Sequence, residues 1–307
     1  EILDDYARYI KERITVGRKL KVVVDAGNGV GGRIAEKIIG DLGCEVSCLY
    51  CDPDGNFPNH VADPTVDEYL TDLIRKVREE EADIGIAYDG DADRVGFVDD
   101  KGGIIRGDQS LILFSREILD KEKGLKIIFE VKCSQALIED IEEHGGIPIM
   151  YRTGHSFIKK RMREEDSPLA GEMSGHFFFA DNYLGYDDGL YASVRMIQLL
   201  SRSDKKLSEI IAGLPHYYST PEIRVKCPDE EKFSIVAQVV EKFKQNYEVI
   251  TVDGARVQFN GGWGLVRASN TEPAIILRFE ADTEEKLQEI KDIILSELRK
   301  YPPLSGI

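Results

Sequence analysis

The feature that most constrains the fold is a repeated alternation of apolar strands, glycine-containing turns and amphipathic helices. KVVVDAGNGVGGRIAEKIIGDLG, residues 21–43, is typical of a buried strand, a tight turn and a helix, and CEVSCLY, residues 44–50, is typical of a second strand. A helix is expected over residues 66–82, and a strand, a loop and a further strand over residues 82–102. This order of elements predicts an α/β domain.

The alternation begins again at residue 124 and later gives way to a different pattern. Residues 124–166 read strand, helix, strand, helix, which predicts a second α/β domain of similar design. Beyond residue 217 the order is a helix, short strands and a last helix. That last helix carries an apolar stripe at Leu287, Ile290, Ile294 and Leu298. We therefore predict an α/β fold with two similar mixed α/β domains, residues 1–103 and 104–217, and a smaller C-terminal α+β domain, residues 218–307.

Net charge and cysteine content limit the kinds of partner and the cellular location that we expect for this protein. The 40 basic and 56 acidic residues give a formal net charge of -16, which argues against a nucleic-acid or membrane partner. Five scattered cysteines predict a reducing, cytoplasmic location and no secreted disulfide framework. Cys48 and Cys51 form one CxxC, but residues three apart on a strand point to opposite faces. Metal or redox use of this pair is therefore the minor interpretation.

Three aspartates alternate with small residues in YDGDADRVG, residues 88–96. Asp89, Asp91 and Asp93 would repel one another unless a cation lay among them, and hard cations such as Mg²⁺ prefer oxygen ligands. Arg94 follows directly, and a cationic side chain beside a metal is best explained by an anion that both bind, such as a phosphoryl group. The alternative is a solvated acidic turn. We favour a magnesium site.

Two further loops carry polar groups suited to a phosphosugar. In GEMSGHFF, residues 171–178, Glu172, Ser174 and His176 alternate, so an extended segment would direct all three to one side, where they suit sugar hydroxyls. In RASNTEP, residues 267–273, an arginine, short hydroxyl and amide side chains and turn N–H groups suit a phosphate monoester. The residues of this second loop that we expect to bind phosphate are Arg267, Ser269, Asn270 and Thr271. A purely structural turn remains the alternative for each loop.

Two single residues, outside these loops, are further candidates for the same site. Lys132 follows the strand IIFEV, and the ends of such strands commonly face a binding cleft. His155 lies in RTGHS at the start of an expected helix. Taken alone, each is more typical of a surface or capping residue, but with the three loops they indicate a cleft for a metal, a sugar and phosphate groups.

The first glycine turn offers a rival interpretation. Gly27, Gly29 and Gly32 fit the dinucleotide pattern GxGxxG, and Asp52 follows about twenty residues later. Against NAD binding, Asp52 begins a loop rich in proline and glycine, and the glycines can simply turn the chain between a strand and a helix. The structural interpretation is preferred.

The four motifs YDGDADR, TGHSFIK, GEMSGH and RASNTEP, in this order in the sequence, resemble those of the α-D-phosphohexomutases, in particular the phosphomannomutase/phosphoglucomutase branch. The resemblance covers essentially the whole chain. It implies an isomerase that interconverts hexose 1-phosphates and 6-phosphates through a phosphoserine and a bisphosphate intermediate.

The resemblance also implies a role for each motif residue. Asp89, Asp91 and Asp93 are expected to bind Mg²⁺, and Arg94, Lys132 and His155 to serve the reacting end of the substrate. Glu172, Ser174 and His176 are expected to contact the sugar. Arg267, Ser269, Asn270 and Thr271 are expected to hold the phosphate that does not react.

The chain departs from the family at its first domain, because no serine here lies in a Thr-Ala-Ser-His-Asn-Pro type loop. Without that nucleophile the isolated chain is expected to be inactive or nearly so, and a separate or removed phosphoserine domain is an expected partner. A phosphosugar-binding protein without catalysis and a phosphoglucosamine mutase are the alternatives. Met173, in GEMSGH, favours hexose mutases over the latter.

Overall fold

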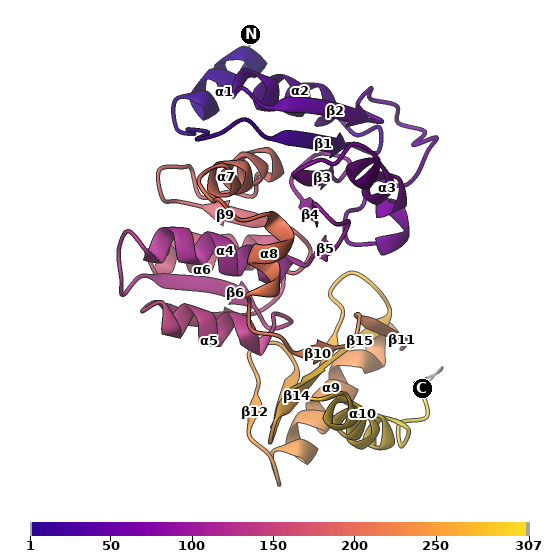
Figure 1. Cartoon of the computed structure of the whole chain (residues 1–307). Coiled ribbons are helices and arrows are strands. Elements are labelled where there is room, and N and C mark those ends of the chain that lie inside the picture. Colours follow the sequence, from indigo (N-terminus) through magenta and orange to yellow (C-terminus); the bar gives the residue numbers. More distant parts are fainter. Residues whose placement is uncertain (1, 305–307) are drawn as a thin grey trace. The chain divides into compact units, whose positions relative to one another are not determined.

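The structure is a computed structural model, and it describes residues 2–304 (Figure 1). The described chain forms two compact units. The first comprises residues 2–129, 137–149 and 154–214, and the second comprises residues 130–136, 150–153 and 215–304. The predicted boundary at residue 103 lies inside the first unit and stays a prediction.

The first sheet has five strands in the order β2-β1-β3-β4-β5. Strands β1, β2 and β3 are parallel, and β4 and β5 add to them as antiparallel strands. The strands are β1 Lys21–Asp25, β2 Glu45–Leu49, β3 Ile84–Tyr88, β4 Val95–Asp99 and β5 Ile104–Ile105. The accompanying helices are α1 Ile2–Lys11, α2 Gly32–Asp41, the 3-10 helix η1 Asp67–Leu70 and α3 Thr71–Glu79.

The sequence pattern explains why these elements form. Strand β1 contains three consecutive valines that are fully buried, as expected for a parallel strand covered on both faces. Helix α2 buries Ala35, Ile38 and Ile39 along one stripe. Leu73 and Val77 of α3 pack with Val23, and all three side chains are fully buried. The predicted strand, turn and helix are therefore confirmed here.

The second sheet has four strands in the order β7-β6-β8-β9. Strands β6 and β8 are parallel, and β9 is antiparallel to β8. The strands are β6 Lys126–Glu130, β7 Ile147–Tyr151, β8 Leu169–Gly171 and β9 Phe177–Phe179. The helices are α4 Gly107–Leu119, α5 Gln135–Glu143, α6 His155–Glu164, α7 Gly189–Ser201 and α8 Leu207–Ala212.

Helix α7 joins the two sheets of the first unit. It contacts both β4 of the first sheet and β9 of the second, and nearly all of its residues are buried. The Tyr88 hydroxyl, at the end of β3, donates a 2.6 Å hydrogen bond to the hydroxyl of Ser193 in α7. A helix that is buried on nearly all sides between two sheets explains why residues 2–214 behave largely as one compact unit.

The second unit is built on a sheet of six strands, β10-β15-β14-β13-β12, with β11 also paired to β15. All of these pairs are antiparallel. The strands are β10 Tyr218–Ser219, β11 Ile223–Lys226, β12 Val249–Ile250, β13 Ala255–Phe259, β14 Gly262–Ala268 and β15 Ala274–Ala281. Helices α9 Asp229–Phe243 and α10 Glu284–Leu298 pack on this sheet.

The predicted apolar stripe of the last helix is confirmed. Ile290, Ile294 and Leu298 are fully buried, and Leu287 packs against the same core. The helix begins where the Thr283 hydroxyl accepts a hydrogen bond from the Lys286 N–H. The predicted fold class, two α/β parts followed by a smaller part that is mostly sheet, is therefore confirmed.

Cys48 and Cys51 form a disulfide, with their Cα atoms 5.9 Å apart. The expectation that they point to opposite faces of a strand was wrong. Strand β2 ends at Leu49, and Tyr50 adopts a left-handed conformation with φ of 52°, which turns the chain back on itself. The strand pattern applies only as far as the strand continues.

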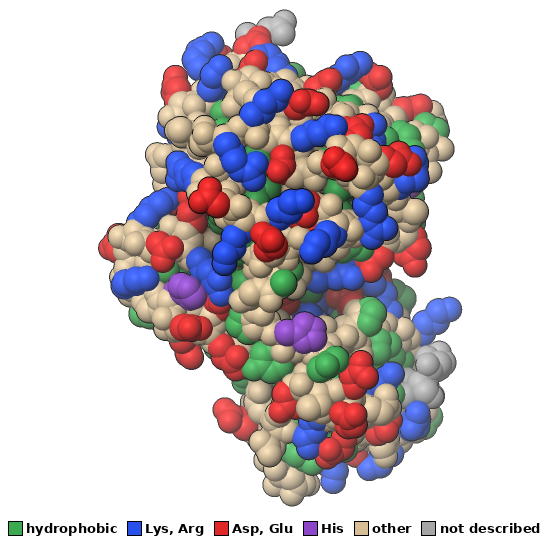
Figure 2. All heavy atoms as spheres, viewed as in Figure 1, with side chains coloured by type: hydrophobic (Ala, Val, Ile, Leu, Met, Phe, Trp, Pro, Cys, Tyr) green, Lys and Arg blue, Asp and Glu red, His purple; other side chains and the backbone are tan. Residues whose placement is uncertain are grey.

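The surface carries mixed charge, and the face in Figure 2 intersperses lysine and arginine with aspartate and glutamate. Among helices within residues 2–304, none is long and apolar enough to cross a membrane.

Candidate functional site

The aspartate loop, residues 89–93, connects β3 to β4. The Ala92 N–H donates a hydrogen bond to the Asp89 carbonyl, and Ala92 has φ of 61°, so the loop turns tightly. Asp89 is buried, Asp93 is half-buried and Asp91 is exposed. Carboxylate oxygens of all three lie within 4.8 Å of one another. The structure therefore brings the three predicted metal ligands together.

Arg94 lies against this loop. Its Nε donates to Asp89 Oδ2 at 2.7 Å, its backbone N–H donates to Asp89 Oδ1 at 3.1 Å, and its Nη1 donates to Asp63 Oδ1 at 3.1 Å. Burial alone would lower the pKa of Arg94, but the contacts with Asp89 and Asp63 raise it overall. Burial raises the pKa of Asp89 and of Asp93. Asp63 is a residue that the motifs did not indicate, because it lies in a loop distant in sequence.

The glycine turn, residues 27–32, packs on the aspartate loop. A Cβ at Gly29 would lie 2.8 Å from the Gly90 carbonyl oxygen, and a Cβ at Gly31 would lie 2.6 Å from the Ala92 Cβ. The Val30 N–H donates to the same Gly90 oxygen at 3.0 Å. Close packing against the protein itself thus accounts for these glycines without a nucleotide. Asp52, the acid of the dinucleotide pattern, is exposed and paired with Arg33.

The sugar loop, residues 172–176, is a tight turn between β8 and β9. The Glu172 N–H donates to the His176 carbonyl, and the Gly175 N–H donates to the Glu172 carbonyl. The expected extended segment was wrong, yet the three side chains still converge. Ser174 Oγ lies 2.9 Å from His176 Nδ1, and Glu172 Oε2 lies 3.4 Å from the same nitrogen.

Backbone contacts join the sugar loop directly to the aspartate loop. Arg94 and His176 form an antiparallel bridge, and the Val95 N–H donates to the Gly175 carbonyl at 3.1 Å. Gly175 has φ of 91°, and a Cβ there would lie 2.5 Å from the Val95 carbonyl oxygen. His176 Nε2 lies 3.5 Å from Asp93 Oδ1. The predicted metal and sugar groups therefore form one site in the first unit.

His155 stacks on His176, with ring centroids 5.7 Å apart. Its Nδ1 lies 3.1 Å from Asp187 Oδ2, and Lys159 Nζ donates to Asp187 Oδ1 at 2.8 Å. Burial lowers the pKa of His176 to about 4. Burial would raise the pKa of Asp187, but the Lys159 hydrogen bond lowers it overall. Asp187 was not predicted, because nothing in YDDG distinguishes it from a helix-capping acid.

A second group of possible metal ligands shares Asp93 with the first. Oxygen or nitrogen atoms of Asp93, His176 and Asp187 lie within 4.8 Å of one another. Asp187 is already paired with Lys159 and lies against His155. The all-carboxylate group therefore fits a hard cation better.

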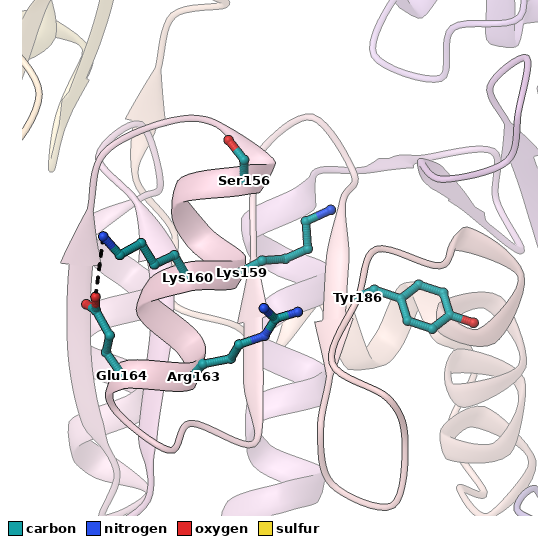
Figure 3. A pocket seen from close by; sticks show the side chains of 6 residues that line it. All are labelled: Ser156, Lys159, Lys160, Arg163, Glu164 and Tyr186. Carbon is teal, nitrogen blue, oxygen red and sulfur yellow. Dashed lines mark ion pairs between the residues drawn. The ribbon is translucent and has the colours of Figure 1, made fainter.

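A surface hollow of about 510 Å³ opens beside helix α6 (Figure 3). Lys159 and Arg163 extend from the helix toward the side on which Tyr186 lies, while Lys160 turns to an ion pair with Glu164. Ser156, at the start of α6, is exposed and also lines the hollow. It belongs to the helix and not to a serine loop.

In the second unit, Arg267 is the penultimate residue of strand β14 and is buried, with 5% of its surface exposed. Its Nε donates to Asp253 Oδ2 at 3.0 Å, and the same oxygen accepts the Thr153 N–H. Ser269 Oγ accepts the N–H groups of Thr271 and Glu272 and so shapes the turn before β15. Asn270 and Thr271 are exposed at its tip.

Lys132 also belongs to the second unit. Its Nζ donates to Glu222 Oε2 at 2.9 Å and lies 3.5 Å from Glu130 Oε1. Burial would lower the pKa of Lys132, but the two carboxylates raise it overall, so the amine is held as a cation. Glu222 and Asp253 are acids that the motifs missed, because each pairs with a motif cation from outside that motif, 90 and 14 residues away along the chain.

Three family models match the chain in order, all of phosphoglucomutase/phosphomannomutase: α/β/α domain II at residues 4–103, α/β/α domain III at residues 106–218 and the C-terminal domain at residues 222–297. Two α/β parts with an acidic loop and a sheet-based third part thus define a multidomain phosphohexomutase architecture. The chain belongs to the phosphoglucomutase/phosphomannomutase family.

Individual relatives support the same family. A phosphomannomutase/phosphoglucomutase of Pseudomonas putida is 48% identical over 304 residues, which cover 99% of this chain and 66% of the relative. A crystal structure of a family protein from Burkholderia thailandensis has a TM-score of 0.91 and 42% identity, covering 100% of this chain and 66% of that one. An Aspergillus fumigatus N-acetylphosphoglucosamine mutase, solved with GlcNAc-6P and magnesium, shares the fold with a TM-score of 0.69 at 16% identity, covering 96% and 68%. The chain therefore spans about two thirds of the length of its relatives.

Proposed function

We propose that this chain supplies the metal-binding, sugar-recognition and phosphate-binding parts of a phosphohexomutase. The reaction is the interconversion of hexose 1-phosphates and 6-phosphates, of mannose or glucose, through a phosphoserine and a bisphosphate. The proposal depends most on the direct contact between the aspartate loop and the sugar loop, where the backbones of Arg94 and His176 pair as an antiparallel β-bridge. The serine nucleophile belongs to a domain outside these 307 residues, so the isolated chain turns over little or no substrate.

The residues present fit a magnesium ion. Asp89, Asp91 and Asp93 offer carboxylate oxygens within 4.8 Å of one another. Asp89 already accepts two hydrogen bonds from Arg94, but a carboxylate has about four acceptor positions and can bind both groups. The magnesium complex of the Aspergillus relative supports this choice of metal. The ion would neutralise phosphate charge that Arg94 also faces.

The remaining motif residues divide between sugar and phosphate. Glu172, Ser174 and His176 converge and provide an acceptor, a hydroxyl and an imidazole for sugar hydroxyls. Arg267 provides guanidinium donors for the phosphate that does not react, and the Ser269, Asn270 and Thr271 turn adds short donors beside it. Lys132, held as a cation by Glu130 and Glu222, offers positive charge for the phosphate group that reacts.

His155 is proposed to handle the proton of the sugar hydroxyl that reacts, and Asp187 to hold its ring. An Nδ1–H that donates to Asp187 leaves Nε2 of the neutral ring as the acceptor. In a reconstituted enzyme, Asp187→Asn should lower kcat more than it changes KM. The His155 ring would stay at the site but would no longer be held in the orientation that proton transfer needs. An unchanged kcat would remove Asp187 from this role.

Reconstitution tests the function. The chain is mixed with a separately produced phosphoserine domain of a relative, Mg²⁺ and glucose 1-phosphate or mannose 1-phosphate, and formation of the 6-phosphate is followed. We expect turnover in the mixture and little or none with either part alone. Full activity of the lone chain would contradict the missing nucleophile. Preference for glucosamine 1-phosphate would favour the phosphoglucosamine alternative, and tight binding without turnover would favour a phosphosugar-binding protein.

A further inference from the structure

The Cys48–Cys51 disulfide lies where a reductant can reach it. Cys48 is half-buried in β2, which is an edge strand of the first sheet, and Cys51 is buried just beyond it. The three free cysteines, Cys44, Cys133 and Cys227, are all buried. Cys48 is therefore the more exposed residue of the pair.

The disulfide closes a turn that holds the glycine turn. The Asn28 N–H donates to the Tyr50 carbonyl at 2.8 Å, and Asn28 Nδ2 donates to the Asp52 carbonyl at 2.8 Å. A Cβ at Gly32 would lie 2.6 Å from the Cys51 Cα, so the two backbones are in close contact. The segment around the disulfide thus fixes both ends of the glycine turn.

The glycine turn in turn supports the aspartate loop. Val30 donates to the Gly90 carbonyl, and the glycines at 29 and 31 pack against Gly90 and Ala92. Contiguous backbone contacts therefore run from the disulfide to the loop that carries Asp89, Asp91 and Asp93.

We propose that Cys48 and Cys51 form a reversible dithiol–disulfide site whose redox state sets the order of the aspartate loop. The partner is a dithiol reductant. A thiolate of this reductant attacks Cys48 Sγ, the bond to Cys51 Sγ breaks, and Cys51 leaves as a thiolate that takes up a proton. The second thiol of the reductant then displaces Cys48 as a thiol, so the chain gains two electrons and two protons and the reductant becomes a disulfide.

Opening the ring changes the turn because Tyr50 is held at positive φ inside it. A residue with a side chain is disfavoured in that conformation, so the reduced chain is free to relax toward ordinary backbone angles. The Tyr50 carbonyl then moves away from the position in which it accepts the Asn28 N–H hydrogen bond. The contacts that hold the aspartate loop through the glycine turn are weakened as a result. The magnesium readout of this inference rests on the proposed function, whereas the backbone readout does not.

The test compares the whole chain in its two redox states. Alkylation under denaturing conditions should label three of the five cysteines after oxidation and all five after treatment with dithiothreitol. Hydrogen exchange of residues 26–32 and 88–93 should be faster in the reduced chain. Mg²⁺ affinity, measured by calorimetry, should be about fivefold weaker in the reduced chain. This factor is at the lower end of the affinity changes usually found between two coupled sites.

Variants control for unrelated effects of the reductant. Cys48→Ser should behave as the reduced chain under both conditions, whereas Cys44→Ser should keep the full redox response. Five labelled cysteines after oxidation, or equal exchange and equal Mg²⁺ affinity in both states, would overturn the inference. Redox-dependent exchange without Mg²⁺ binding in either state would support the redox site and contradict the magnesium assignment.

Discussion

At the scale of single residues, the cationic side chains of the motifs are already held by acids of their own unit. Arg94 contacts Asp89 and Asp63, Lys132 contacts Glu222, and Arg267 contacts Asp253. Hydrogen bonds to ionised partners fix the direction of a long side chain and reduce the entropy that ordering it for a ligand would cost. Substitution of an exposed motif residue, or a charge-conserving substitution of a buried one, therefore tests ligand binding with the least effect on folding.

Asp91→Asn is expected to weaken Mg²⁺ binding by about tenfold or more, because one of three anionic ligands is lost. The residue is exposed, so the melting temperature without metal should change by less than about 2 °C. Calorimetry and thermal melting measure the two effects. Asp120→Asn, at another exposed aspartate, is the control. A large loss of stability without metal would count against a metal loop.

Arg267→Lys is expected to weaken binding of glucose 6-phosphate by about tenfold, because lysine keeps the charge and loses the planar fork. Mg²⁺ binding should stay unchanged. Arg224→Lys, at an exposed arginine of the same unit, is the matched control. If Arg267→Lys reduced metal and phosphosugar binding equally, the phosphate assignment would be in doubt.

At the scale of elements, the loop after β2 is tied to β1 by a histidine. His60 Nε2 lies 3.1 Å from Oδ2 of Asp25, which ends β1, while Tyr50 and Tyr69 pack beside the ring. The hydrogen bond with Asp25 raises the pKa of His60, with Asp72 adding to the effect and burial opposing it. The same Asp25 accepts the Gly27 N–H, so this contact helps to position the glycine turn.

The His60 contact is expected to depend on pH. Because the folded-state pKa of His60 lies above its ordinary value of 6.5, the contribution to stability is complete below about pH 6.5 and is lost as pH rises through the folded-state pKa. The melting temperature of the wild type minus that of His60→Gln should thus be largest in mildly acidic buffer and shrink by about pH 9. His216→Gln, at an exposed histidine, should show no such trend. A difference independent of pH would refute the ionic contribution.

Helix α10 gives a prediction about packing. Ile294 is fully buried against β14, where a Cβ at Gly264 would lie 2.4 Å from its Cδ1. Ile294→Ala removes about three methyl or methylene groups from a site that cannot easily close, so the free energy of unfolding should fall by about 2–5 kcal/mol. Urea unfolding measures the loss. Ser296→Ala, at an exposed position of the same helix, should change it by less than about 0.5 kcal/mol.

At the scale of the whole molecule, the proposed metal ligands lie in the first unit and the one tryptophan, Trp263, lies buried in the second. Trp263 Nε1 donates to Glu280 Oε1 at 2.8 Å, so its fluorescence should report unfolding of the second unit. Circular dichroism reports helices and strands of both units.

Mg²⁺ should therefore stabilise the two units unequally. At 100 times its Kd, a ligand of the native first unit raises that unit's free energy of unfolding by about 2.7 kcal/mol. The part of the circular dichroism transition that comes from the first unit should shift to higher urea, while the Trp263 transition stays in place. Equal shifts by both probes would show that the units unfold together or that the metal binds elsewhere. Ca²⁺-free, Mg²⁺-free buffer gives the reference curves.

The amino-acid sequence by itself determined the order of elements and the candidate ligand groups. Periodicity depends only on neighbouring residues, so the valines of β1 and the stripe on α10 indicated their elements directly. Motif spacing likewise identified Asp89, Asp91 and Asp93, whose proximity follows from a short loop. Periodicity was misleading at Cys51, because one residue with positive φ ended the strand pattern.

Only the tertiary structure decided which groups meet. Asp63 and Asp187 reach Arg94 and His155 from loops 31 and 32 residues away, and Glu222 reaches Lys132 from 90 residues away. Such contacts depend on how strands and helices pack, which no local pattern encodes. The same holds for the glycine turn, whose residues fit a nucleotide pattern in sequence but pack on the aspartate loop in space. Local chemistry indicated the candidate ligands, and packing decided which partners they meet, because charge pairing acts through space and not along the chain.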